Sequence, residues 1–131
     1  MSAEKNGCPD LVVRAVKGFL AGEERVLRVG EEIVVGRSRG ADFSVRKARS
    51  LAARTDCAEV LRSAPFLSVS RKHVKIHFLH KDLVEVQDLS VNGTYMDGKR
   101  IDCVALTDLR EKSHTLALGV CERLVLEYRA R

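Results

Sequence analysis

The chain has 131 residues, of which 45% are hydrophobic and 31% charged, and its formal net charge is +5. This length suits one domain with one core, and this composition is that of a folded globular protein, which excludes a disordered chain. No apolar run approaches the length of a membrane-spanning helix, and no apolar stretch of the secretory type follows Met1. We therefore expect an intracellular protein of the nucleus or cytoplasm that has no membrane partner.

Short segments rich in Val and Ile follow one another along the chain, separated by turns. Within them apolar and polar residues alternate, which is typical of half-buried strands, and the recurrent helices of a parallel α/β fold are missing. The pattern predicts an all-β antiparallel sandwich of two sheets over residues 10–131, after a tail at 1–9. The expected strands are 11–16, 25–29, 32–35, 73–79, 83–88, 94–96, 99–101, 115–118 and 121–128.

Residues 46–67, here called the basic insertion, interrupt this pattern with Ala, Leu and Arg. Five basic residues against two acidic ones give the insertion +3 of the net charge of +5. Asp56 followed by Glu59 predicts the start of a short helix that Pro65 would end. A loop of this length is either functional or disordered. A basic surface of this kind attracts an acidic partner, either a phosphopeptide or a nucleic acid.

The four cysteines are scattered and form no zinc-binding pattern. No two of them stand at C-x-x-C spacing, and no histidine lies beside them at ligand spacing. We therefore expect free thiols, no metal site and no cofactor.

Gly36 and Arg37 close an expected strand. The glycine permits an abrupt exit from the sheet, and the arginine offers planar donors that can engage two phosphate oxygens at once. Taken alone, Arg37 is more simply interpreted as a solvated arginine at a strand end.

Ser70 to His73 opens the strand that follows the basic insertion. The Ser70 hydroxyl can donate to a phosphate oxygen, and Arg71 or Lys72 can add positive charge. His73 is better suited to linking two loops than to touching a ligand. A serine three residues before a histidine also suggests a nucleophile and its base, but the glycine pattern and orienting acid of such a site are missing.

Asn92, Gly93 and Thr94 form the third motif. Asn-Gly is a turn signal in its own right, and the amide of Asn92 could also grip the backbone of an extended peptide.

In this order and spacing, the three motifs resemble those of the forkhead-associated (FHA) domain, from about Leu11 to Tyr128. The resemblance implies a sandwich of the FHA/SMAD type whose loops at one end bind phosphothreonine peptides, without catalysis. It implies peptide contacts for Arg37, Ser70, Arg71, Val91, Asn92 and Thr94. Arg37 and Ser70 would bind the phosphate, with Arg71 as an additional cation. Asn92 would hold the peptide backbone, and Val91 would form a pocket for the threonine methyl group. Gly36, His73 and Gly93 would support the loops.

The sequence departs from the family pattern in two places, and alternative functions stay open. The basic insertion enlarges the loop before Ser70, and Ser68 stands where some members of the family have another arginine. The expected partner is a phosphothreonine-containing protein, with the isolated domain as a monomer. One alternative is a scaffold or oligomer contact that ignores phosphate. The other, less expected, is nucleic-acid binding through the basic insertion, where Phe66 is the one aromatic residue able to stack on a base.

Overall fold

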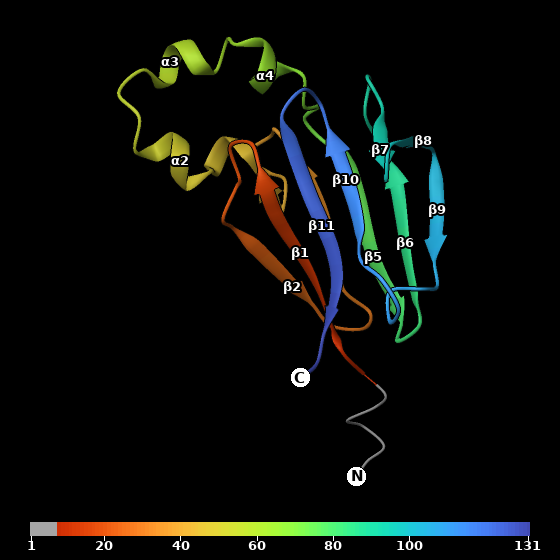
Figure 1. The fold of residues 1–131 in the computed structure, drawn as a ribbon. Helices are drawn as coiled ribbons and strands as arrows, with labels where there is room; N and C mark the ends of the chain where they lie inside the picture. The colour runs from red at the N-terminus through yellow and green to blue at the C-terminus, as the bar shows by residue number, and fades with distance from the viewer. Residues whose placement is uncertain (1–7) are drawn as a thin grey trace.

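The computed structural model describes residues 8–131, so most of the tail predicted for residues 1–9 lies outside the described residues. Two β-sheets face each other, and the helices gather at one end of them, away from the C terminus (Figure 1). The predicted β-sandwich is therefore confirmed. The strands are β1 (Asp10–Lys17), β2 (Glu24–Leu27), β3 (Glu32–Gly36), β4 (Phe43–Ser44), β5 (Val74–His80), β6 (Leu83–Asp88), β7 (Thr94–Met96), β8 (Lys99–Ile101), β9 (Cys103–Leu106), β10 (His114–Leu118) and β11 (Glu122–Arg129).

One sheet has the order β2-β1-β11-β10-β7-β8, and the other has the order β4-β3-β5-β6-β9. Strands β1 and β11 pair antiparallel from Asp10 and Arg129 inward, so the first and last strands lie side by side. The short β4 pairs with β3 in the parallel direction, while β3 and β5 are antiparallel neighbours. The loops that carry the three sequence motifs all leave the sandwich at the end where the helices lie.

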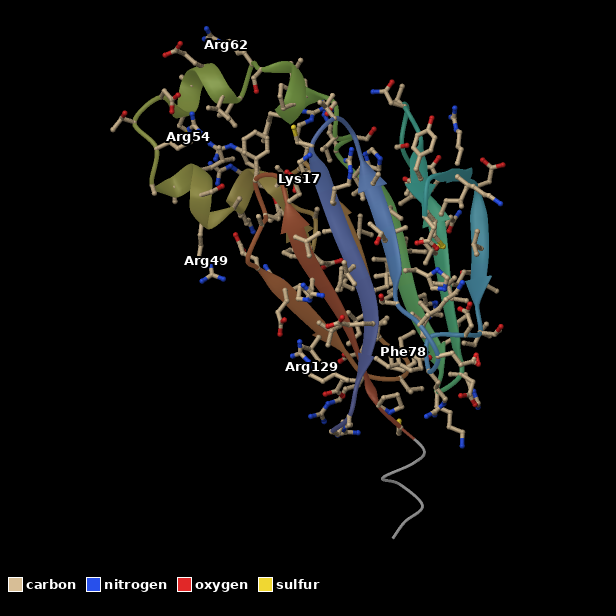
Figure 2. The ribbon with its side chains drawn as sticks, in the orientation of Figure 1. Lys17, Arg49, Arg54, Arg62, Phe78 and Arg129 are labelled. Atoms are coloured by element: carbon tan, nitrogen blue, oxygen red, sulfur yellow. The ribbon has the colours of Figure 1, made fainter. Side chains whose placement is uncertain are left out.

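The core fills the space between the sheets. In β5, Val74, Ile76 and Phe78 are fully buried, while the residues between them are partly exposed, as the alternation in the sequence predicts. Leu116 and Leu124 of the other sheet are equally buried in the same hydrophobic cluster. Phe78 lies toward the end of the sandwich opposite the helices (Figure 2). Each such side chain stabilises the fold by about 1.5–3 kcal/mol on burial.

Short helices form the basic insertion and its approach: the 3₁₀ helix η1 (Val45–Lys47), α2 (Arg49–Ala52), α3 (Cys57–Val60) and α4 (Ala64–Leu67). A helix does begin after Asp56, but the Asp56 side chain makes no capping bond and pairs instead with Arg54, at 2.7 Å between Oδ1 and Nε. The prediction that Pro65 ends a helix is wrong. Pro65 lies in the first turn of α4, where its missing N–H removes no helical hydrogen bond.

The basic insertion is packed against the hairpin between β1 and β2. Leu51, Val60 and Phe66 turn inward and are buried. The Phe66 ring meets the Phe19 ring edge to face, with 6.0 Å between centroids and 79° between planes. The Ser50 hydroxyl donates to the Phe19 carbonyl at 2.7 Å. These contacts give the insertion a defined place on the sandwich, and they withdraw Phe66 from any base that could stack on it.

Candidate functional site

Two loops cross at the helical end of the sandwich and are joined through their backbones. The Arg37 N–H donates to the Ser70 carbonyl at 2.9 Å, and the Ser38 N–H donates to the Arg71 carbonyl at 3.1 Å. Gly36 makes this approach possible, because a Cβ on it would lie 2.8 Å from the carbonyl carbon of Arg71 and closer still to its oxygen. The first two sequence motifs are therefore adjacent in space because Gly36 has no side chain.

His73 links the second and third motifs through a fully buried imidazole ring. Its Nδ1 accepts the Ser70 N–H at 3.0 Å, and its Nε2 lies 2.9 Å from the Gly93 carbonyl. A backbone N–H can only donate and a carbonyl can only accept, so the ring is neutral and carries its proton on Nε2. Burial lowers the pKa of His73, which favours this neutral form, although the bond to Gly93 opposes the shift. The ring touches the backbone and not the hydroxyl of Ser70, so His73 is not placed to act as its base.

The Asp88 carboxylate organises the third motif. Its Oδ1 accepts from the Ser90 N–H at 3.0 Å, the Ser90 hydroxyl at 2.6 Å and the Thr94 hydroxyl at 2.8 Å. Partial burial raises the pKa of Asp88, but the hydrogen bonds from Ser90 and Thr94 outweigh it, so the pKa is lowered. Gly93 adopts a φ of +104°, and its N–H donates to the Ser90 hydroxyl at 2.7 Å. Thr94 is fully buried, so its hydroxyl supports the loop from inside.

Arg37 reaches over the end of the basic insertion. Its Nε donates to the Val69 carbonyl at 2.8 Å, and its guanidinium carbon lies 6.0 Å from the centre of the Phe66 ring. Among the described residues nothing accepts from the two Nη groups of Arg37. The side chain is therefore oriented by one of its five donors, while four remain for a ligand.

A hollow of about 380 Å³ opens where Arg37 ends. The Ser70 Oγ accepts the Val91 N–H at 3.0 Å, which leaves the hydroxyl proton free to be donated. Val91 is 84% exposed, an unusual fraction for a valine. Three cations and a hydroxyl thus share the hollow with two apolar side chains. The lining residues are Arg37, Ser70, Arg71, Lys72, Leu89 and Val91.

A second hollow, of about 260 Å³, lies where the third motif faces the turn between β10 and β11. Asn92 is exposed at its edge. Ser68 joins the basic insertion to this turn, because its Oγ accepts the Val120 N–H at 2.9 Å and donates to the Pro65 carbonyl at 2.7 Å. The lining residues are Ser68, Asn92, Gly93, Tyr95, Gly119 and Val120.

Most residues expected to contact a peptide come together here. Arg37, Ser70, Arg71 and Val91 line the first hollow, and Asn92 lines the second. Thr94 lines neither of these two hollows, and its full burial does not fit the direct contact expected of it.

Leu89 and Tyr95 were missed from the sequence. Tyr95, 40% exposed, follows the buried Thr94, so the alternation of side chains along a strand would have directed it outward once Thr94 was known to face inward. Leu89 lies just beyond the end of β6, where no periodic signal applies.

Across residues 8–131 no group of three or more potential metal ligands lies together. No helix in the same range is long and apolar enough to cross a bilayer.

Comparison with known proteins agrees with this geometry. A family model described as FHA domain matches residues 33–116. The FHA domain of a hypothetical protein from Arabidopsis thaliana is 25% identical, with a TM-score of 0.68 and coverage of 100% of this chain and 97% of that one. The FHA domain of the CT664 protein from Chlamydia trachomatis is 23% identical, with a TM-score of 0.65 and coverage of 91% and 98%.

A third similar structure belongs to work on phosphothreonine-dependent FHA domain interactions. It is 22% identical, with a TM-score of 0.60 and coverage of 93% of this chain and 97% of that chain. The comparison with curated proteins found no match.

Proposed function

The chain belongs to the FHA domain family, and we propose that it is a phosphothreonine-dependent protein interaction module. In this proposal residues 10–131 act without catalysis, as an intracellular monomer, and bind a phosphothreonine-containing protein through the two hollows. The first hollow carries the proposal, because it presents the four free N–H groups of Arg37 beside the free hydroxyl proton of Ser70.

A phosphate near neutral pH carries between one and a half and two negative charges and three acceptor oxygens. Arg37 would engage two of these oxygens, since its planar donors match their spacing, and Ser70 would donate to the third. Arg71 and Lys72, both exposed at the mouth of the hollow, would add charge. Because Nε of Arg37 is already bound to the Val69 carbonyl, little side-chain entropy would be lost on binding.

Leu89 and Val91 supply the apolar part of the same hollow. The γ-methyl group distinguishes phosphothreonine from phosphoserine, and its burial against Val91 would favour phosphothreonine by about 0.8 kcal/mol, or about fourfold in affinity. Asn92 would pair with the peptide backbone beyond the phosphothreonine, since its amide both donates and accepts.

The test is calorimetry with three versions of one peptide carrying threonine, phosphothreonine or phosphoserine. We expect binding of the phosphothreonine peptide, weaker binding of the phosphoserine peptide and none of the unmodified one. Arg37→Ala should weaken phosphothreonine binding at least tenfold, or about 1.4 kcal/mol. Lys81→Ala, in the turn between β5 and β6 at the other end of the sandwich, is the matched control and should bind as the parent does. Equal affinity for the modified and unmodified peptides would refute the proposal and leave the phosphate-independent contact in its place.

A further inference from the structure

A third hollow, of about 290 Å³, lies between the turn that follows β3 and the first helices of the basic insertion. Arg39 borders it from the turn, and Arg46 and Lys47 border it from η1. Three positive side chains therefore surround one small opening, whose remaining wall is mostly apolar. The full lining is Arg39, Arg46, Lys47, Ala48, Leu51, Ala52 and Cys57.

None of these three cations has a carboxylate partner among residues 8–131, in contrast to their neighbours in the chain. Arg49 is paired with Glu23 and Arg54 with Asp56. The acid nearest to Arg39 in the chain is Asp42, and its carboxylate is turned to β3, where it accepts the Val34 N–H at 2.9 Å. Like charges brought together without a counter-charge repel one another, so this arrangement favours an external anion.

The hollow is fixed in position relative to the proposed phosphothreonine site. Arg37 lines one and Arg39 lines the other, and Ser38 stands between them. Ser38 is held from both sides, because its N–H donates to the Arg71 carbonyl at 3.1 Å and its carbonyl accepts the Ser44 hydroxyl at 2.7 Å. An extended peptide advances about 3.3 Å per residue, so side chains a few residues apart can reach both hollows.

We propose that this third hollow binds a second phosphorylated side chain of the same peptide, about three residues before or after the phosphothreonine. This proposal rests on the proposed function. Arg39 and Arg46 offer the planar donors that suit phosphate oxygens, and Lys47 adds a further charge. The apolar wall of Leu51 and Ala52 lowers the local polarity, which strengthens each of these contacts. Asn92 borders a different hollow, which is built from other loops. The peptide segments on the two sides of the phosphothreonine would therefore contact separate surfaces.

The experiment compares one phosphothreonine peptide with two versions that carry an added phosphoserine, either three residues before or three residues after the phosphothreonine. We expect one of the two positions to bind about tenfold tighter than the singly phosphorylated peptide. The double variant Arg46→Ala with Lys47→Ala should lose this gain and keep the parental affinity for the singly phosphorylated peptide. That retained affinity also shows that the variant is folded. Arg39→Ala, in an exposed turn, should lose most of the gain as well.

The matched control removes the same charge elsewhere, through Arg62→Ala with Lys81→Ala. Arg62 lies on the outer side of the helices (Figure 2) and lines none of the hollows described above, so the gain should persist. The inference is overturned if neither doubly phosphorylated peptide gains affinity, or if the gain survives the loss of Arg46 and Lys47. A glutamate that gives the full gain at the same position would overturn the assignment to phosphate. Failure of the singly phosphorylated peptide to bind better than its unmodified form would instead refute the proposed function.

Discussion

Replacing Gly36 with Ala is expected to destabilise the domain and to weaken phosphopeptide binding together. The added Cβ would lie 2.8 Å from the carbonyl carbon of Arg71 and 3.0 Å from Cα of Lys72. Both are backbone atoms, so no flexible side chain can swing away. The strand or the loop must shift instead, and a shift of this kind costs about 1–3 kcal/mol.

The backbone hydrogen bonds between the two loops give a second estimate of the free energy that the substitution would cost. The N–H groups of Arg37 and Ser38 donate to the loop across the crossing, and that of His73 donates back to Val35. Each such bond contributes about 1 kcal/mol, so separating the loops would lose up to about 3 kcal/mol. Both measures are consistent with a destabilisation of about 1–3 kcal/mol. Peptide binding should fall as well, because Arg37 and Ser70 lie on the two segments that are pushed apart.

Gly40→Ala provides the matched control in the same turn. The nearest atom to a Cβ at Gly40 is the Ser38 Oγ at 3.6 Å, an ordinary contact. Its substitution should therefore be neutral, or stabilising by about 0.4–1 kcal/mol through the loss of freedom in the unfolded chain. Urea unfolding monitored by circular dichroism measures the free energy of unfolding of both variants, and calorimetry measures their affinity for the peptide. A difference below about 0.5 kcal/mol between the two variants would refute the close-approach reasoning for Gly36.

Two further predictions concern stability. Both nitrogens of His114 face carboxylates, with Nδ1 2.5 Å from Asp97 and Nε2 2.7 Å from Asp108, so both must donate and the ring is charged. Burial lowers the pKa of His114, but the two carboxylates outweigh burial, so the pKa in the folded protein is raised. The charged ring therefore stabilises the fold fully below the ordinary value near 6.5. This stabilisation is lost as the pH rises through the folded pKa. The free energy of unfolding should therefore fall from pH 6 to pH 9 more steeply for the parent than for His114→Gln, and parallel curves would contradict this. Phe66→Ala should cost about 3 kcal/mol in urea unfolding, because it empties a buried ring site; a cost below about 1 kcal/mol would mean that the insertion is not packed as described.

The sequence predicted nine of the eleven strands in residues 8–131, because the longer strands carry their own periodic signal, and it missed β4 and β9. In β5 the alternation of Val74, Ile76 and Phe78 with polar residues reports directly which face is buried. β7 has only three residues, too few for such a signal, and Thr94 was expected to contact a peptide because of the family resemblance, although its side chain lies inside. Which side chains of a short strand face the core is decided by the strands that pair with it, and these are remote in sequence.

The helices of the basic insertion were predicted less well for a related reason. α2, α3 and α4 have four residues each, which is too short to be stable alone or to show a helical period. Contacts with the β1–β2 hairpin hold them, such as the Arg49 N–H that donates to Glu23 at 2.9 Å. Pro65 was therefore interpreted as the end of one helix, although it lies at the beginning of another.

The basic insertion contacts the first of the three motifs through Arg37. The Val69 carbonyl that orients Arg37 lies two residues after the insertion, and the Phe66 ring lies 6.0 Å from the guanidinium carbon of Arg37. Ser68 joins the same segment to the turn at Val120 that borders the second hollow. A change that loosens this segment should therefore free the Arg37 side chain and lower phosphopeptide affinity even where Arg37 itself is intact. In that sense the segment that departs from the family pattern supports the residue on which the proposed phosphate contact depends most.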